Sequence, residues 1–194
     1  KAENEIKEQR AKINEQTRLY NSISDLVRPQ LEKISCLIEA EGDFKKNMAH
    51  ICILNCYVKR RANLTLLADR KPFFSTEELY LSLKESSEYL RLYGVSSDVY
   101  GGESSVVSSS VILFSFDLWQ KVLENEIIRL NAVMAKINIS DGLFSFRIST
   151  DTDFCEGLES VFEDAEALGG RLEVFKEEDT TYITFKIKTG GEAL

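Results

Sequence analysis

An apolar residue recurs at every seventh position near the amino terminus of this chain. The repeat consists of Ile6, Ile13, Tyr20, Val27 and Ile34. A seven-residue apolar repeat predicts a long helix whose seam packs against other helices, as in coiled coils and helical bundles. Several of the intervening seam positions are glutamine. A seam interrupted in this way is typical of helices that shift register or rotate.

A second helical pattern follows after a short turn. Glu41-Gly42-Asp43 reads as the turn, and residues 44 to about 70 continue with apolar side chains at three- and four-residue spacing. Two long helices joined by so short a loop pack as an antiparallel hairpin. One hairpin cannot enclose a core, so we expect a second copy to complete a four-helix bundle. Residues 1–70 are therefore predicted to be the dimerisation hairpin of a homodimer.

Residues 75–190 alternate between helical and extended patterns after a linker at residues 71–74. Ser75 is the predicted helix cap and Gly94 the predicted helix end. The predicted helices are 75–93, 114–130 and 155–168, and the predicted strands are 97–100, 105–110, 132–139, 143–149, 171–176 and 181–188. This order predicts an α+β sandwich, with one mixed sheet covered by helices on one face.

The net charge of −8 bears on the class of partner. Proteins that bind nucleic acid present concentrated Lys and Arg, so we expect no nucleic-acid partner. No apolar run approaches the roughly 20 residues that span a bilayer, and no signal peptide is present. Because the chain opens on Lys1 inside a charged helix, we expect a piece of a longer protein, with a membrane reached only through an upstream region.

The four cysteines do not have the spacing of a metal or disulfide framework. We interpret Cys36, Cys52, Cys56 and Cys155 as small buried residues in a reducing, cytoplasmic setting. The basic cluster Lys59-Arg60-Arg61 is interpreted as a solvated face or a surface that pairs with carboxylates.

Within the first helix, Ser24-Asp25-Leu26-Val27-Arg28-Pro29-Gln30-Leu31 resembles the phosphoacceptor box of sensor histidine kinases. In that family the box reads His-Glu/Asp-Leu-Arg-x-Pro-Leu. Ser24 takes the place of the histidine, Asp25 that of the acid and Pro29 that of the proline. The resemblance therefore implies a degenerate phosphoacceptor position, although Ser24 is equally read as an ordinary helix serine.

The second half resembles the ATPase domain of the same family, which has the Bergerat-type α/β sandwich. Its element order agrees, and Gly169-Gly170 before the last hairpin is similar to the closing motif of that family. The resemblance spans residues from about 12 to 188. It implies a histidine-kinase-like ATPase domain over residues 75–190.

The residues expected to bind nucleotide depart from the family pattern. Family members ligate Mg²⁺ with an asparagine, and Arg129 falls at that position. A guanidinium cannot ligate a cation. Asn125 and Glu124 are weaker alternatives as nucleotide contacts, against the interpretation as a helix cap or exposed polar residues. Asn131 lies two positions late for the metal role, which places it on another helix face or off the helix end.

The adenine-binding box is also altered. Asp151 could stand in for the adenine-binding acid, but Asp153 and Phe154 replace the glycine and spacer that follow. The glycine-rich lid of the family is absent, because the next helix is predicted to begin at Cys155. We therefore expect a degenerate ATP site with no cofactor and no metal, or ATP and Mg²⁺ if the activity survives.

His50 is the only histidine. It is interpreted as a buried or partner-satisfied side chain, with a phosphotransfer role as the alternative. No Ser/His/Asp or Cys/His nucleophile set is evident.

The combined prediction is a signal-transduction module like the cytoplasmic core of a two-component sensor histidine kinase. We expect it to be catalytically impaired and to act as a dimeric scaffold or regulator that binds a response regulator or another histidine kinase. The alternative is an active ATP-dependent histidine kinase with a noncanonical nucleotide site and acceptor.

Overall fold

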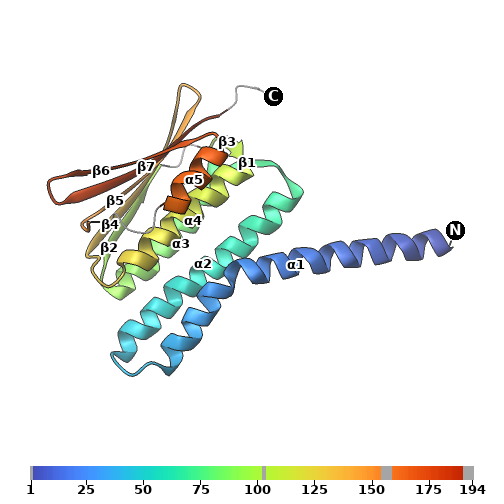
Figure 1. Ribbon diagram of the computed structural model, residues 1–194, viewed down its shortest axis with the longest axis horizontal. Coiled ribbons are helices and arrows are strands. Elements are labelled where there is room, and N and C mark those ends of the chain that lie inside the picture. Colours follow the sequence, from blue (N-terminus) through green and yellow to red (C-terminus); the bar gives the residue numbers. More distant parts are fainter. Residues whose placement is uncertain (1, 102–103, 154–158, 190–194) are drawn as a thin grey trace.

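The first two helices form the predicted hairpin. The computed structural model describes residues 2–101, 104–153 and 159–189. Helix α1 spans Ala2–Glu39 and α2 spans Phe44–Arg70. The Asp43 carboxylate caps α2 by accepting hydrogen bonds from the backbone amides of Lys45 and Lys46. In Figure 1, α1 is bent, so that its C-terminal part lies beside α2 and its N-terminal part extends away from the molecule.

The bend divides the heptad repeat into two environments. Ile23 and Val27 are buried within the single chain, whereas Ile6, Ile13 and Tyr20 are 51%, 60% and 62% exposed. Pro29 is inside α1, and a proline within a helix removes one backbone hydrogen bond and kinks the helix. The apolar seam is therefore covered by α2 only at its C-terminal end.

The remainder of the chain, from β1 to β7, is called the sheet half below. Its elements in chain order are β1 Phe73–Ser75, α3 Thr76–Tyr93, β2 Ser96–Tyr100, β3 Val106–Ser108, α4 Ser109–Glu126, β4 Ala132–Ser140, β5 Leu143–Thr150, α5 Glu159–Ala167, β6 Arg171–Glu177 and β7 Thr180–Lys188.

The main sheet has the strand order β2-β4-β5-β7-β6. Strands β2 and β4 are parallel and the other neighbours are antiparallel, which confirms the predicted mixed sheet. Figure 1 shows successive layers: the sheet, then α3, α4 and α5, then α2, and α1 outermost. Apolar side chains alternate along the strands so that one face packs on the helices. The fold is the expected α+β sandwich following a helical hairpin.

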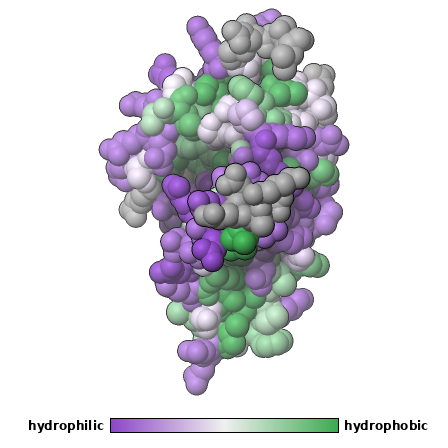
Figure 2. All heavy atoms as spheres, turned by 90° about the vertical axis from the view of Figure 1, so that its right-hand side faces the viewer, coloured by the Kyte–Doolittle hydropathy of each residue, from purple (hydrophilic) through white to green (hydrophobic). Residues whose placement is uncertain are grey.

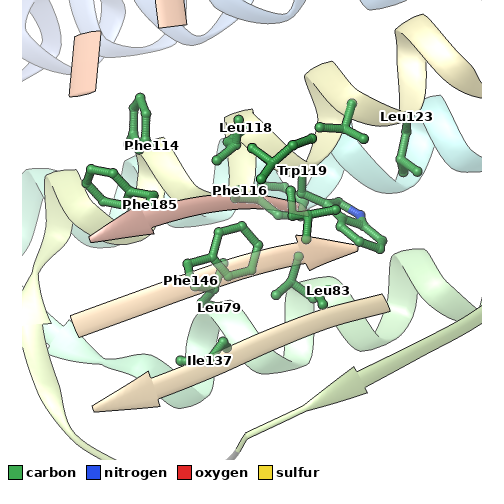
Figure 3. Packing of buried hydrophobic residues seen from close by; sticks show 14 of the residues in the cluster. Leu79, Leu83, Phe114, Phe116, Leu118, Trp119, Leu123, Ile137, Phe146 and Phe185 are labelled. Atoms are coloured by element: carbon green, nitrogen blue, oxygen red, sulfur yellow. The ribbon is translucent and has the colours of Figure 1, made fainter. Parts of the chain in front are cut away.

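The core lies between the sheet and α3 and α4, where aromatic side chains from both layers interlock (Figure 3). Trp119 of α4 is fully buried, and its indole N–H donates to the Ser86 hydroxyl on α3 at 3.0 Å. Ile53, Tyr57 and Leu64 of α2 belong to the same apolar cluster. The second hairpin helix is thus packed into the core of the sheet half.

Three local predictions differ from the structure. Helix α4 begins at Ser109, whereas the predicted helix began at residue 114, because Val111, Ile112 and Ser115 bury one helical face. Part of the predicted linker forms β1, which pairs with β3. Cys36 is exposed and Cys52 is half-buried, so of the three cysteines described only Cys56 is buried as expected. Phe154 and Cys155 lie outside the described residues.

Candidate functional site

The degenerate phosphoacceptor box lies on the outer surface of α1. Ser24, Asp25 and Pro29 are all exposed, and Arg28 forms an ion pair with Asp25 one turn earlier. Exposure makes Ser24 accessible, yet a serine hydroxyl needs an adjacent base to become a nucleophile. Within the part of the chain that the structure describes, Asp25 is engaged by Arg28, and no hydrogen bond between it and Ser24 occurs.

Glu124 on α4 faces the hairpin. Its Oε1 accepts hydrogen bonds from the Gln30 side-chain amide of α1 at 3.0 Å and from Gln120 at 2.8 Å. The Lys33 ammonium lies 3.9 Å from its Oε2. The side chain that the sequence offered as a nucleotide contact therefore holds the first helix against the fourth.

Arg129, at the position of the family's metal ligand, makes a local ion pair. Its guanidinium lies 3.0 Å from the carboxylate of Glu126, a side chain that is only 4% exposed. Asn131 donates its side-chain amide to the Arg129 carbonyl at 3.3 Å. Asn125 is exposed on α4. Arg129 and Asn131 therefore make local contacts just after the C-terminal end of α4.

Asp151 closes the start of β4. Its Oδ1 accepts hydrogen bonds from the backbone amides of Asn131 and Ala132, both at 3.1 Å. Burial raises the pKa of this carboxyl, but the hydrogen bonds from Ala132 and Asn131 outweigh burial and hold the pKa below its usual value. Asp151 is thus a charged turn residue. Glu124 contacts α1, whereas the Arg129 carbonyl and the Asp151 carboxylate both contact Asn131.

A further carboxylate on α4, which no sequence pattern marks, pairs with two side chains of α2. Asp117 accepts hydrogen bonds from Arg61 Nε at 2.6 Å, Arg61 Nη2 at 3.0 Å and the Tyr57 hydroxyl at 2.8 Å. Burial, followed by the charge of Asp117, raises the pKa of the Tyr57 phenol far above its usual value, so Tyr57 stays a donor. This cluster fastens α2 to α4.

The basic cluster on α2 pairs with carboxylates on the sheet half. Lys59 and Arg60 both bind Glu85 of α3, while Arg61 binds Asp117. Burial raises the pKa of Glu85, but hydrogen bonds from the two cations outweigh it and lower the pKa. The carboxylate-pairing interpretation of residues 59–61 is therefore correct. Only the acidic partners, distant in sequence, were beyond prediction.

His50 lies between the hairpin helices and the sheet half. Its ring meets the Tyr93 ring edge-on, with 6.3 Å between centroids. Burial lowers the pKa of His50, the charge of Lys33 lowers it further, and Glu124 partly opposes them. The half-buried histidine is thus kept neutral, in keeping with the interpretation as a packed side chain.

A groove with a volume of about 540 Å³ lies between α4 and α5. Apolar side chains such as Leu113, Leu118 and Val161 line it, and Arg61 and Lys121 lie among its charged residues. Glu124, Arg129 and Asp151 are not among the described residues that form its walls. The sequence-predicted nucleotide residues and the groove therefore do not form a common site.

Two other classes of site are absent from the described ranges. Over residues 2–101, 104–153 and 159–189, no three His, Cys, Asp or Glu side chains gather as metal ligands. Across the same ranges, every helix is too short or too polar to cross a bilayer.

Comparisons with known proteins give a structural likeness. No protein-family model and no curated protein matches this sequence. The histidine kinase domain of the blue-light activated histidine kinase from Erythrobacter litoralis EL346 superposes with a TM-score of 0.55 and 14% identity, over 85% of this chain and 96% of that domain. A longer chain of the same kinase gives 0.54 and 13%, over 90% of this chain and 60% of that one.

Histidine kinase AdeS from Acinetobacter baumannii is similar at 12% identity, with a TM-score of 0.49 over 89% of this chain and 98% of that one. Because the identities are low, the superpositions on the Erythrobacter kinase show similarity of fold alone. This chain has a sensor histidine kinase-like fold.

Proposed function

We propose that this chain is a signal-transduction module of the two-component kinase type whose catalytic chemistry is impaired, and that it acts as a dimeric scaffold or regulator. The observation that carries the proposal is the engagement of Glu124, Arg129 and Asp151 by neighbouring groups of the chain. A nucleotide would have to displace these contacts. Arg129 in place of a metal ligand would also repel Mg²⁺.

The attachment of α2 to the sheet half supports the same proposal. Phosphate transfer requires the donor and the acceptor to come within bonding distance. Here Arg61, Tyr57 and Asp117 hold α2 on α4, and β1 after α2 is paired with β3. The Pro72 carbonyl also accepts a hydrogen bond from the Ser109 amide at 2.8 Å. Such a tethered arrangement favours a fixed surface over a catalytic domain that travels to residue 24.

The exposed apolar side chains of the hairpin support homodimerisation. Ile6, Ile13 and Tyr20 are more than half exposed in the single chain, and Ile38 and Phe44 near the hairpin turn are 68% and 77% exposed. Figure 2 shows hydrophobic side chains gathered down the lower part of the molecule, where Figure 1 places the hairpin. A second copy that completes a four-helix bundle would cover them.

Within this proposal residues 1–70 are the dimerisation unit and residues 75–190 the degenerate ATPase-like unit. The dimer would present the outer hairpin surface to a response regulator or to another histidine kinase. Exposed Cys36 without a disulfide partner fits a reducing cytoplasm.

The first test is the binding of Mg-ATP by calorimetry. With Arg129 at the position of the metal ligand, we expect a Kd weaker than about 1 mM, less than ~4 kcal/mol of binding free energy. A low micromolar Kd would refute the proposal. As a second arm, Ser24→His restores an exposed histidine at the acceptor position and should still incorporate no label from radioactive ATP. Label that is lost on adding Asp151→Asn would show a working nucleotide site.

A further inference from the structure

The two hairpin helices are held to the sheet half by unequal contacts. Helix α2 contributes Ile53, Tyr57 and Leu64 to the core. It also contributes Arg61, whose side chain is 9% exposed and binds Asp117 through two nitrogen atoms. Paired guanidinium contacts of this kind are both strong and directional. Helix α2 is therefore attached to the sheet half by both apolar and charged contacts.

Helix α1 is attached differently. Ile23 and Val27 are its buried apolar side chains. Its hydrogen-bonded contact with α4 is made by Gln30 to Glu124, with Lys33 nearby. Glu124 lies two helical turns after Asp117 on α4, so the two carboxylates share one helix face. One carboxylate serves α2 and the other serves α1.

The Glu124 contact is built so that it can open without leaving an unsatisfied charge. Glu124 Oε1 also accepts from Gln120 on its own helix at 2.8 Å, and its side chain is 22% exposed to solvent. When Gln30 leaves, Gln120 and water can satisfy the carboxylate. While Gln30 contacts Glu124, by contrast, the side-chain oxygen of Gln30 is buried without a hydrogen-bond partner. Opening would hydrate that oxygen.

The neighbouring proline makes α1 the yielding side of the contact. Pro29 directly precedes Gln30 and leaves one carbonyl of α1 without its helical donor. The N-terminal half of α1 extends away from the body (Figure 1), so a force applied there passes through Ile23 and Val27 to Pro29 and Gln30. The fixed body of α2 and the sheet half resists it.

We infer that α1 is the moving element of this protein and that Gln30 and Glu124 form a latch between α1 and α4. Movement of α1 about Pro29 separates Gln30 from Glu124, while Arg61 and Asp117 keep α2 on the sheet half. This inference deepens the proposed function, because the element released is the helix that would form the dimer. It gives the scaffold two states without any nucleotide.

Hydrogen–deuterium exchange of the full chain tests the latch. In Glu124→Ala, amides of residues 20–39 should exchange about tenfold faster than in the wild type, while amides of residues 50–66 should keep their rates. The matched control is Glu163→Ala, which removes an exposed carboxylate from α5 and should change neither segment. Unchanged rates in residues 20–39, or equal acceleration of both segments, would overturn the inference.

Gln30→Ala opens the latch from the other side and leaves α4 untouched. It should accelerate residues 20–39 as Glu124→Ala does, and the double variant should exchange no faster than the faster single variant. Additive effects would show that the two side chains act independently. All samples are matched in oligomeric state by light scattering. Tight Mg-ATP binding would refute the proposed function and leave this result standing, whereas the exchange data can fail while nucleotide binding stays absent.

Discussion

Two carboxylates on α4, Asp117 and Glu124, each bind one helix of the hairpin to the sheet half. Asp117 accepts three hydrogen bonds from α2, yet it is 37% exposed, whereas its partner Arg61 is 9% exposed. The energetic weight of the pair therefore lies on the buried guanidinium. Loss of Arg61 would leave the Asp117 carboxylate with hydrogen bonds from only Tyr57 and water.

We expect Arg61→Met to lower the free energy of unfolding by about 2 kcal/mol, since it removes a charge-assisted pair but keeps the apolar stem. Urea denaturation measures the change. Arg171→Met is the control, because the Arg171 side chain is 80% exposed and its 3.3 Å pair with Glu173 should contribute no more than ~0.5 kcal/mol. Equal losses in the two variants would contradict this ranking.

His50 makes stability depend on pH in a defined direction. Burial, with the charge of Lys33, lowers its pKa below the ordinary 6.5 in the folded chain. As pH falls through 6.5, the unfolded chain binds a proton that the folded chain refuses, so the free energy of unfolding decreases. The stabilisation is complete above that pH and is lost progressively below it.

Unfolding free energies measured by urea from about pH 8 to pH 5 should therefore fall more steeply for the wild type than for His50→Gln. Glutamine keeps a polar side chain of similar size and cannot titrate. Parallel curves for the two proteins would show that His50 is as easily protonated in the folded state as in the unfolded state.

Among the elements, the joint between α5 and β6 accounts for the Gly-Gly pair by backbone conformation at Gly169 and by packing at Gly170. Gly169 ends α5 with φ of +77°, and no atom lies within 4 Å of where its Cβ would be. At Gly170, a Cβ would lie 2.4 Å from the buried Phe185 ring and 3.0 Å from the Lys186 carbonyl. The motif that resembles a nucleotide-binding family is thus required here by the β6–β7 hairpin.

Gly170→Ala should cost about 2 kcal/mol of stability, because the Phe185 ring is fully buried and cannot withdraw without moving β7. Gly169→Ala should cost about 1 kcal/mol, the strain of a left-handed residue with open space around it. Thermal or urea unfolding measures the loss of stability in each of the two variants. A larger loss at position 169 than at 170 would contradict the packing argument.

For the whole molecule, the layers run from the sheet through α3, α4 and α5 to α2, and end with α1 (Figure 1). Each layer is covered by the next except α1. Its N-terminal seam residues remain exposed, whereas Val27 is 4% exposed within one chain. In the proposed dimer, assembly would therefore depend on other members of the heptad repeat than the packing of the single chain does.

Ile13→Asp should convert the proposed dimer into a folded monomer, because it places a charge on the exposed part of the seam. Light scattering measures the mass, and circular dichroism the folding. Ile128→Asp is the control, since Ile128 is 89% exposed and lies outside the seam. Val27→Asp should instead unfold the hairpin. A wild-type chain that is monomeric at micromolar concentration would contradict the dimer.

Much of this architecture could be predicted from the chain alone. Helix and strand periods, the Glu41-Gly42-Asp43 turn and the Gly94 helix end are local signals, and they predict the hairpin and the mixed sheet. The start of α4 was missed, because the serine-rich stretch before it carries no strong signal for either helix or strand. The sequence likewise shows directly that position 24 is not a histidine and that position 129 is an arginine.

Partners across the fold were decided only by tertiary structure. Asp117 meets Arg61 from 56 positions away in the chain, and Glu124 meets Gln30 from 94. Periodicity predicts which face of a helix is polar, but the same polar face can bind solvent, a ligand or another helix. Glu124, a carboxylate that resembled a remnant of a nucleotide site, is a contact with the hairpin because the packing of α1 brings Gln30 to it.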